Sequence, residues 1–139
     1  MQLTLTTNYA IGIVVYMSEH RGVCAKSNEM MRALHITPQY ITSVMKMLIS
    51  SDLVGSKQGR FGGYYLRRQA EEISLYDLIC SVEGGVRLNR SRREETRICS
   101  VMDSVQDEII RILKDITIVD FLFESDKDVS RVRQEDFLG

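Results

Sequence analysis

The chain has 139 residues, of which 44% are hydrophobic, and 18 basic and 19 acidic side chains give it a net charge of −1. This length suffices for one domain with a single core, or for one domain with an appendage. No apolar run reaches the roughly 20 residues of a membrane span, no basic and apolar leader opens the chain, and three cysteines at irregular spacing do not indicate a disulfide framework. These features predict a cytoplasmic protein with reduced thiols and no membrane partner.

The charges are unevenly distributed along the chain. Residues 1–90 hold ten Lys and Arg against seven Asp and Glu, whereas residues 91–139 hold eight against twelve. A mildly basic N-terminal part and an acidic C-terminal part fit a DNA-facing domain followed by a partner-facing segment. A random scatter of solvated charges accounts for these counts nearly as well, so the counts alone do not decide.

Apolar periodicity predicts two helices in the first quarter of the chain. After an extended stretch over 3–6, Thr7 or Asn8 is expected to cap a first helix that reaches about residue 20. Its apolar stripe consists of Tyr9, Ala10, Ile13, Val14 and Met17. Ser27 is expected to cap a short second helix over 28–34, whose inward residues are Met30, Met31 and Leu34.

A third helix is predicted to begin at the Thr37-Pro38 pair. The Thr hydroxyl can accept a hydrogen bond from an amide of the first turn, and Pro is tolerated at the first helical position. The apolar residues that follow at helical spacing are Ile41, Val44, Met45, Leu48 and Ile49. The opposite face consists of Gln39, Tyr40, Ser43, Lys46 and Met47. Most of these side chains can contact DNA phosphates or base edges.

A β-hairpin is predicted after Asp52, because a short strand, a glycine-rich turn and a second strand over 64–67 follow one another. The glycines allow positive φ at the tip, and the basic residues around it are Lys57, Arg60, Arg67 and Arg68. A solvated hairpin with incidental charge is the simpler reading of this stretch alone. Helix, turn, helix and hairpin in this order instead predict a winged helix-turn-helix that binds DNA.

The second half of the chain is predicted to be helical as well. Ser74 is expected to cap a helix over 75–82, and a polar loop over 86–96 leads to a long helix over about 100–115. Thr117 is expected to cap a last short helix through Phe123. We therefore expect a DNA-binding head over 1–84, a loop over 85–99, a dimerisation helix and short following helix over 100–124, and a loose tail over 125–139.

The long helix carries an apolar stripe that the small head is not expected to cover. Its members assigned to a dimer interface are Val105, Ile109, Ile112 and Leu113. The sequence therefore predicts a mainly α protein, with a hairpin wing and a long dimerisation helix, that works as a homodimer.

Four stretches carry a resemblance to a known family. They are L-T-T-N-Y-A at 5–10, T-P-Q-Y-I at 37–41, G-R-F-G-G-Y-Y-L at 59–66 and E-I-S-L-Y-D-L-I-C-S-V-E-G at 72–84. In this order and spacing they resemble the Rrf-two family of bacterial winged-helix regulators, the family of IscR, NsrR and CymR. The resemblance implies a dimer on a partly palindromic double-stranded operator, and repression in preference to activation.

The expected DNA contacts combine this resemblance with the charge pattern. Thr37, Gln39, Tyr40 and Thr42 match recognition-helix positions of the family. The full predicted set is Thr37, Gln39, Tyr40, Thr42, Ser43, Lys46, Lys57, Gln58 and Arg60. Gln58 replaces a frequent Arg, Arg60 replaces a usual Pro, and Thr42 replaces a Glu found in several members. The DNA sequence of the operator therefore cannot be inferred from the operator of a relative.

Cluster-binding members carry three cysteines, about five residues apart, before the long helix, because a cluster needs converging thiolates. The corresponding loop here has only Cys99, so no metal and no cofactor are expected. Cys80 is read as a small core residue, and Cys99 and Cys24 are possible redox-sensitive thiols. A small ligand or a partner protein remains an alternative signal.

Two other functional classes compete with a DNA-binding regulator. An enzyme would need convergent acid, base or nucleophile groups, and the sequence indicates none. A winged-helix module that binds proteins instead of DNA would carry acidic or apolar replacements on its recognition face, which is not the pattern of the third helix.

Overall fold

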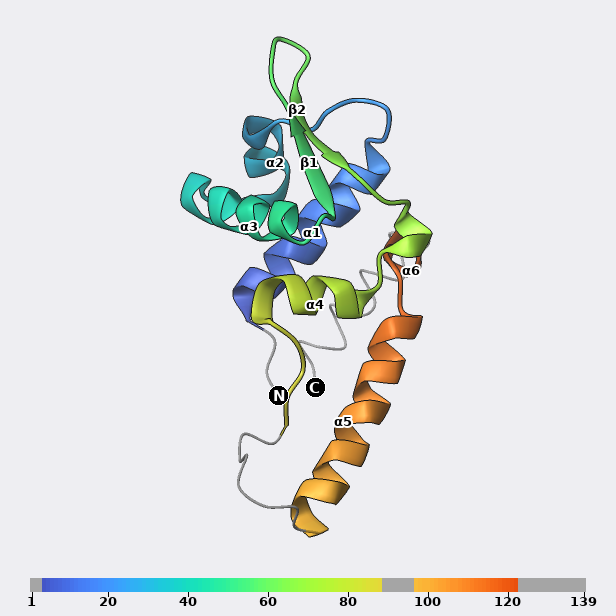
Figure 1. Cartoon of the computed structure of the whole chain (residues 1–139). Coiled ribbons are helices and arrows are strands. Elements are labelled where there is room, and N and C mark those ends of the chain that lie inside the picture. The colour runs from blue at the N-terminus through green and yellow to red at the C-terminus, as the bar shows by residue number, and fades with distance from the viewer. Residues whose placement is uncertain (1–3, 89–96, 123–139) are drawn as a thin grey trace, which may run out of the picture.

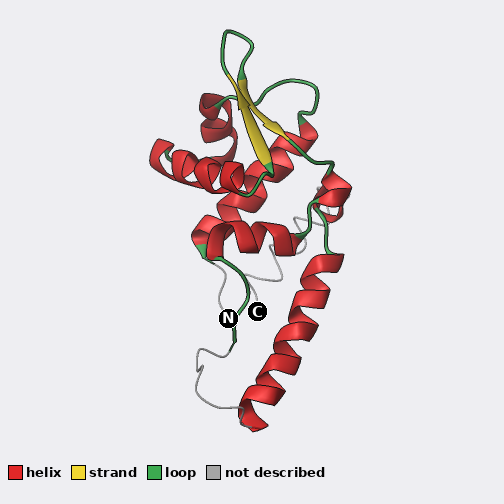
Figure 2. Ribbon diagram, in the orientation of Figure 1, coloured by secondary structure: helices red, strands yellow, loops and turns green. Residues whose placement is uncertain are grey.

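The described part of the chain is a helical head with one β-hairpin, from which a long helix extends (Figures 1 and 2). The computed structural model describes residues 4–88 and 97–122. Its elements are α1 (Leu5–Glu19), α2 (Ser27–Leu34), α3 (Pro38–Ser50), β1 (Val54–Lys57), β2 (Gly63–Leu66), the 3-10 turn η1 (Ala70–Glu72), α4 (Leu75–Glu83), α5 (Arg97–Asp115) and α6 (Ile118–Leu122). This architecture confirms the predicted class, a mainly helical winged helix-turn-helix.

The core lies where α1 meets α2, α3 and α4. In α1 and α3 the buried side chains recur at helical spacing, because one side of each helix faces its neighbours. They are Ala10, Ile13, Val14 and Met17 in α1 and Ile41, Val44, Met45 and Leu48 in α3. Between α2 and α3 the backbone of His35 adopts a left-handed φ of 55°, which ends α2 and turns the chain into α3.

Ile49 departs from the predicted stripe of α3, since its side chain is 38% exposed. With 3.6 residues per turn, Ile49 lies roughly a quarter turn from the centre of the stripe. It faces a groove between the N-terminus of α2 and the hairpin, where Lys26 and Ser56 are among its neighbours. The prediction that Ile49 is a core residue is therefore wrong.

The hairpin is held against the rest of the head by backbone pairing. β1 and β2 run antiparallel, with Lys57 opposite Gly63. The amide of Ala25 donates to the carbonyl of Tyr64, and the amide of Tyr64 donates to the carbonyl of Ala25, both at 2.8 Å. Gly63 makes this close approach possible, because its φ is +143° and a Cβ there would lie 2.6 Å from the carbonyl oxygen of Ala25.

The chain returns to the head after α5. The amide of Leu75 donates to the carbonyl of Ile116 at 2.8 Å, and the amide of Ile118 donates to the carbonyl of Ile73 at 3.0 Å. Ile118 is fully buried in the core of the head. α6 therefore packs against the head, beside α1 and η1. Phe123, the expected end of this helix, and the predicted tail over 125–139 lie outside the described residues.

α1 begins earlier than the sequence predicts. Its first residue is Leu5 and its N-cap is Thr4, so Thr6 is helical and not extended, and neither Thr7 nor Asn8 is the cap. The Oε1 atom of Glu83, at the end of α4, accepts hydrogen bonds from the amide of Thr4 at 2.9 Å and from the hydroxyl of Thr7 at 2.8 Å. The hydroxyl of Thr4 also accepts a hydrogen bond from the amide of Thr7 at 3.3 Å, so the start of α1 combines a local cap with a carboxylate from another helix.

α4 agrees with its predicted boundaries to within one residue. Ser74 and Asp77 form a reciprocal capping box at its start, with both hydrogen bonds at 3.0 Å. At its end Gly84 takes a left-handed conformation, with a φ of 82°, as expected of a glycine after the last turn.

α5 begins at Arg97 instead of near Ser100. Ile98 lies three residues before Val101 and seven before Val105, so the apolar stripe extends one turn further toward the N-terminus than predicted. Cys99 consequently lies in the first turn of the helix and not in a loop. Over residues 4–88 and 97–122, no helix combines the length and the apolar character that crossing a membrane requires.

The close backbone approach at Gly63 generates a stability prediction. Gly63→Ala adds a Cβ against the carbonyl of Ala25 in a conformation that disfavours side chains, and should lower the free energy of unfolding by about 1–3 kcal/mol. Gly12→Ala is the matched control, because Gly12 lies inside α1 and its new Cβ would contact only the side chain of Leu34, at 3.9 Å. That change should be neutral or stabilising by up to about 1 kcal/mol. Urea unfolding measures both, and an equal effect of the two changes would contradict the proposed contact.

The contact between α4 and α1 generates a pH prediction. Hydrogen bonds from the amide of Thr4 and the hydroxyl of Thr7 hold the pKa of Glu83 below its ordinary value. The ionised form is favoured in the folded state, so this contribution is present above the unfolded pKa and is lost as pH falls through the folded pKa. Glu83→Gln should therefore be less stable than the unmodified protein at neutral pH, and the difference should shrink below about pH 4.

Unfolding of both proteins across this pH range measures the effect. Glu71→Gln removes an equal charge from an exposed position in η1 and serves as the control. A stability difference for Glu83→Gln that stays constant with pH would show that the carboxylate charge has no part in starting α1.

Candidate nucleic-acid interface

The exposed face of α3 is polar and carries no carboxylate. Pro38 occupies the first turn and Thr37 the N-cap, as predicted, but the Thr37 side chain makes no capping hydrogen bond. The side chains that face solvent along this helix are Gln39, Tyr40, Thr42, Ser43, Lys46 and Ile49. From Pro38 to Ser50 the sequence holds no Asp or Glu, so nothing on this helix would repel a phosphate.

Two of these side chains are already engaged within the head. The ring of Tyr40 meets Tyr9 of α1 edge to face, with centroids 5.2 Å apart, and remains 42% exposed. The hydroxyl of Thr42 donates to the carbonyl of Pro38 at 3.0 Å, which leaves its lone pairs open. Among the predicted base contacts on α3, Gln39 and Ser43 are exposed, and their side chains make no hydrogen bond to another described residue.

The wing places two predicted cations beside a tight tip. Lys57, Gln58 and Arg60 are all exposed, and the amide of Gly62 donates to the carbonyl of Gly59 at 3.0 Å to close the turn. The ammonium of Lys26, which precedes α2, donates to the carbonyl of Arg60 at 3.3 Å. From Val54 to Leu66 the sequence again holds no carboxylate.

Phe61, which is not among the predicted DNA contacts, stands at the tip of the wing. Its side chain is 85% exposed, and the guanidinium carbon of Arg60 lies 5.8 Å from its ring centroid. An aromatic ring between Arg60 and Gly62 in a turn could have been noticed, because a hairpin tip offers it no core to pack against.

α3 and the wing border one groove. The groove that Ile49 faces is lined by Lys26 and Ser27 at the start of α2 and by Lys57 to Gly59 of the wing. In Figure 1, α3 and the projecting hairpin lie toward the end of the head opposite to α5. The C-terminal end of α3, at Ile49, and the wing residues Lys57 and Gln58 therefore lie along the same groove.

A second exposed surface follows α5. Its large apolar side chains are Ile98, 74% exposed, Val101, 61%, Val105, 43%, and Ile112, 52%. Leu113 and Ile109, by contrast, pack with Ile79 and Val86 of the same chain. The predicted interface set is therefore divided, with Val105 and Ile112 facing outward and Leu113 buried within its own chain.

The three cysteines lie on three different elements and form no disulfide. Cys24 is in the segment between α1 and α2, Cys80 is on α4 and Cys99 is on α5, and each is half-buried. A hydrogen bond with Cys80 raises the pKa of the Tyr76 hydroxyl. Within residues 4–88 and 97–122, no three His, Cys, Asp or Glu side chains gather as a metal site would require.

Known proteins match this chain over most of its length. The HTH-type transcriptional regulator YffB of Lactococcus lactis is 24% identical over 79% of this chain and 78% of its own. The regulator NsrR of Halalkalibacterium halodurans is 23% identical over 91% of this chain and 94% of its own. CymR, the global cysteine regulator of B. subtilis, shares the fold with a TM-score of 0.78 at 20% identity, covering 91% of this chain and 99% of CymR. A family model described as Rrf2, iron-dependent transcriptional regulator, matches residues 3–124, and the chain therefore belongs to the Rrf2 family of transcriptional regulators.

Proposed function

We propose that this chain is a sequence-specific regulator that binds double-stranded DNA as a homodimer, with α3 in the major groove and the wing on the adjacent backbone or minor groove. The observation that carries this proposal is that α3 and the wing border one groove and that neither Pro38–Ser50 nor Val54–Leu66 holds a carboxylate. Repression of the target genes rests on the family resemblance alone. A winged-helix module for protein partners is disfavoured, because the exposed face of α3 carries no acidic side chain and is mostly polar, although Tyr40 and Ile49 are exposed on it.

Base reading and backbone binding belong to different residues in this proposal. Gln39 can pair with a base edge through both atoms of its amide, whereas Lys57 and Arg60 carry charge suited to phosphates. Phe61 is assigned as an apolar wedge, since proteins that bind the minor groove frequently insert apolar side chains such as Phe between base steps. Its high exposure in the free protein is consistent with a partner that covers it.

Dimerisation is proposed through the outward stripe of α5. Ile98, Val101, Val105 and Ile112 recur at intervals of three, four and seven residues, the spacing of a helix that packs along another helix. Such a stripe, exposed along a helix that leaves the head, is the kind of patch that marks an interface. Leu113 is assigned instead to the contact between α5 and α4.

The family description mentions iron, but the thiols of this chain do not fit an iron–sulfur cluster. Such a cluster needs several thiolates that converge, whereas the three cysteines stand on separate elements. A thiol switch at Cys99 or Cys24 stays a prediction. Cys99, in the first turn of α5, lies next to Ile98 of the outward stripe, so oxidation there would act on the proposed dimer contact.

Single substitutions and salt titration test whether base contacts and phosphate contacts are made by different residues. Gln39→Ala should cost about 1–3 kcal/mol on the specific operator and relax sequence preference. Lys57→Ala or Arg60→Ala should weaken binding to every duplex and reduce the salt slope by about one unit. Phe61→Ala should lower affinity and DNA bending without changing the salt slope, because it removes no charge.

Fluorescence anisotropy on selected and random duplexes at several salt concentrations supplies these values. Arg87→Ala, an exposed cation away from α3 and the wing, is the control and should change neither affinity nor slope. If all changes acted equally on specific and random DNA, the assignment of separate roles would be wrong.

The dimer proposal is tested at Ile112. Ile112→Asp removes an apolar contact of about 1.5–3 kcal/mol per side chain and places a charge in each half of the interface, so it should yield monomers and lose tight operator binding. Ser100→Asp adds an equal charge roughly a third of a turn around α5 from the outward stripe and should leave the dimer intact. Sedimentation at micromolar concentration decides, and an unmodified protein that sediments as a monomer would refute the proposal.

A further inference from the structure

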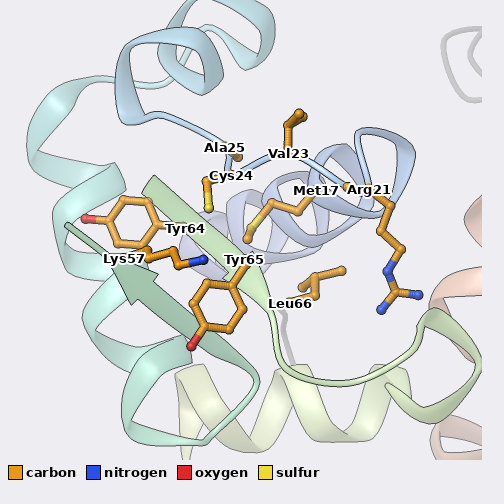
Figure 3. Close-up of a pocket in the computed structure, with 10 residues that line it drawn as sticks. Met17, Arg21, Val23, Cys24, Ala25, Lys57, Tyr64, Tyr65 and Leu66 are labelled. Atoms are coloured by element: carbon orange, nitrogen blue, oxygen red, sulfur yellow. The ribbon is translucent and has the colours of Figure 1, made fainter. Parts of the chain in front are cut away.

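A cavity lies behind the wing, between both hairpin strands and the segment that joins α1 to α2 (Figure 3). Its volume is 350 Å³, within the range of sites that hold small molecules. Its mainly apolar lining residues are Met17, Val23, Ala25, Tyr64, Tyr65 and Leu66. None of the functions assigned above uses this cavity.

The charge of the cavity is one-sided. Arg21 and Lys57 both line it and lie well apart in Figure 3, while none of its lining residues is acidic. The guanidinium of Arg21 donates to the side chain of Gln69 and, at 2.9 Å, to the carbonyl of Arg68, so its position is fixed by neutral acceptors that leave its charge unpaired. Two cations separated by an apolar wall match a molecule with an acidic group at each end.

From this arrangement we infer that the cavity binds a small organic dicarboxylate with an apolar middle, and that this ligand weakens DNA binding. One carboxylate pairs with Arg21 and the other with the ammonium of Lys57. Only the second part of this inference, that the ligand weakens DNA binding, rests on the proposed function. In that proposed function Lys57 contacts a DNA phosphate. A ligand that holds Lys57 in the cavity removes that contact.

The position of the cavity gives the ligand a second route to the wing. Tyr64 and Tyr65 of β2 line it, and Tyr64 is paired with Ala25, which also lines it. A molecule seated there contacts both partners of the backbone pairing that sets the angle of the hairpin. Binding at the cavity and binding of DNA are therefore coupled, and by linkage each must weaken the other by the same factor.

The first test uses the protein without DNA. Terephthalate, a benzene ring with two opposite carboxylates, is titrated while the amide signals of Gly22, Cys24, Ala25 and Tyr64 are followed by NMR. Saturable shifts confined to these residues are expected for terephthalate, weaker ones for its half-amide, and none for the neutral diamide of the same shape. Equal binding by the diamide, shifts spread over α5, or no saturable shift would overturn the inference.

Substitutions test whether Arg21 and Lys57 each bind one carboxylate of the ligand. Arg21→Gln and, separately, Lys57→Gln should each reduce terephthalate affinity to that of the half-amide, and Arg21→Lys should restore part of it. Arg87→Gln, remote from the cavity, should bind terephthalate like the unmodified protein. Thermal melting of each variant confirms that the head is folded, and terephthalate binding unchanged in both Arg21→Gln and Lys57→Gln would overturn the assignment.

The second test measures affinity for a random duplex, with sodium chloride adjusted so that ionic strength stays constant. Saturating terephthalate should weaken DNA binding by at least about fivefold, the lower end of measured coupling between sites. In Arg21→Gln, which lies outside the proposed DNA surface, DNA affinity without terephthalate should be unchanged and the effect of terephthalate should disappear. Terephthalate that binds without altering DNA affinity would overturn the regulatory half, whereas a protein that binds no duplex at all would refute the proposed function and leave the amide shifts to decide the site.

Discussion

The reciprocal hydrogen bonds between Ala25 and Tyr64 are the contact on which the functional side of the head depends. They join the segment before α2 to the second strand of the wing at 2.8 Å in each direction. The helix-turn-helix and the hairpin are thereby held in one orientation, and only a glycine at position 63 allows the approach. The proposed DNA surface lies on one side of this junction and the cavity behind the wing lies on the other.

Lys57 stands at the meeting point of these two sides. It ends β1, contributes to the groove beside α2 and also lines the cavity with Arg21. Because the cavity and the groove are separate sites, the flexible side chain of Lys57 that turns its ammonium into the cavity turns it away from the proposed DNA surface. A single side chain could therefore link occupancy of the cavity to the strength of DNA binding without a large change of fold.

The long helix is divided between two tasks by its own periodicity. Leu113 and Ile109 attach α5 to α4, whereas Ile98, Val101, Val105 and Ile112 remain outward. Because the first pair lies on a neighbouring sector of the same helix, α5 can be fixed to its own head and still offer an apolar stripe to a second chain. α6 then returns Ile118 to the core of the head, so the long helix is anchored beyond its C-terminal end as well.

The sequence by itself determined the order of the elements, the inward faces of α1 and α3, and the glycine-rich basic wing, because apolar periodicity, caps and turn residues are local signals. It did not reveal the true start of α1, where the carboxylate of Glu83 on α4, 79 residues away in the sequence, accepts a hydrogen bond from the amide of Thr4. Nor did it show that Ile49 is exposed, that Leu113 is buried by its own chain or that a cavity lies between Arg21 and Lys57. Those features were decided by the tertiary structure, since burial and charge pairing depend on which distant segments pack together.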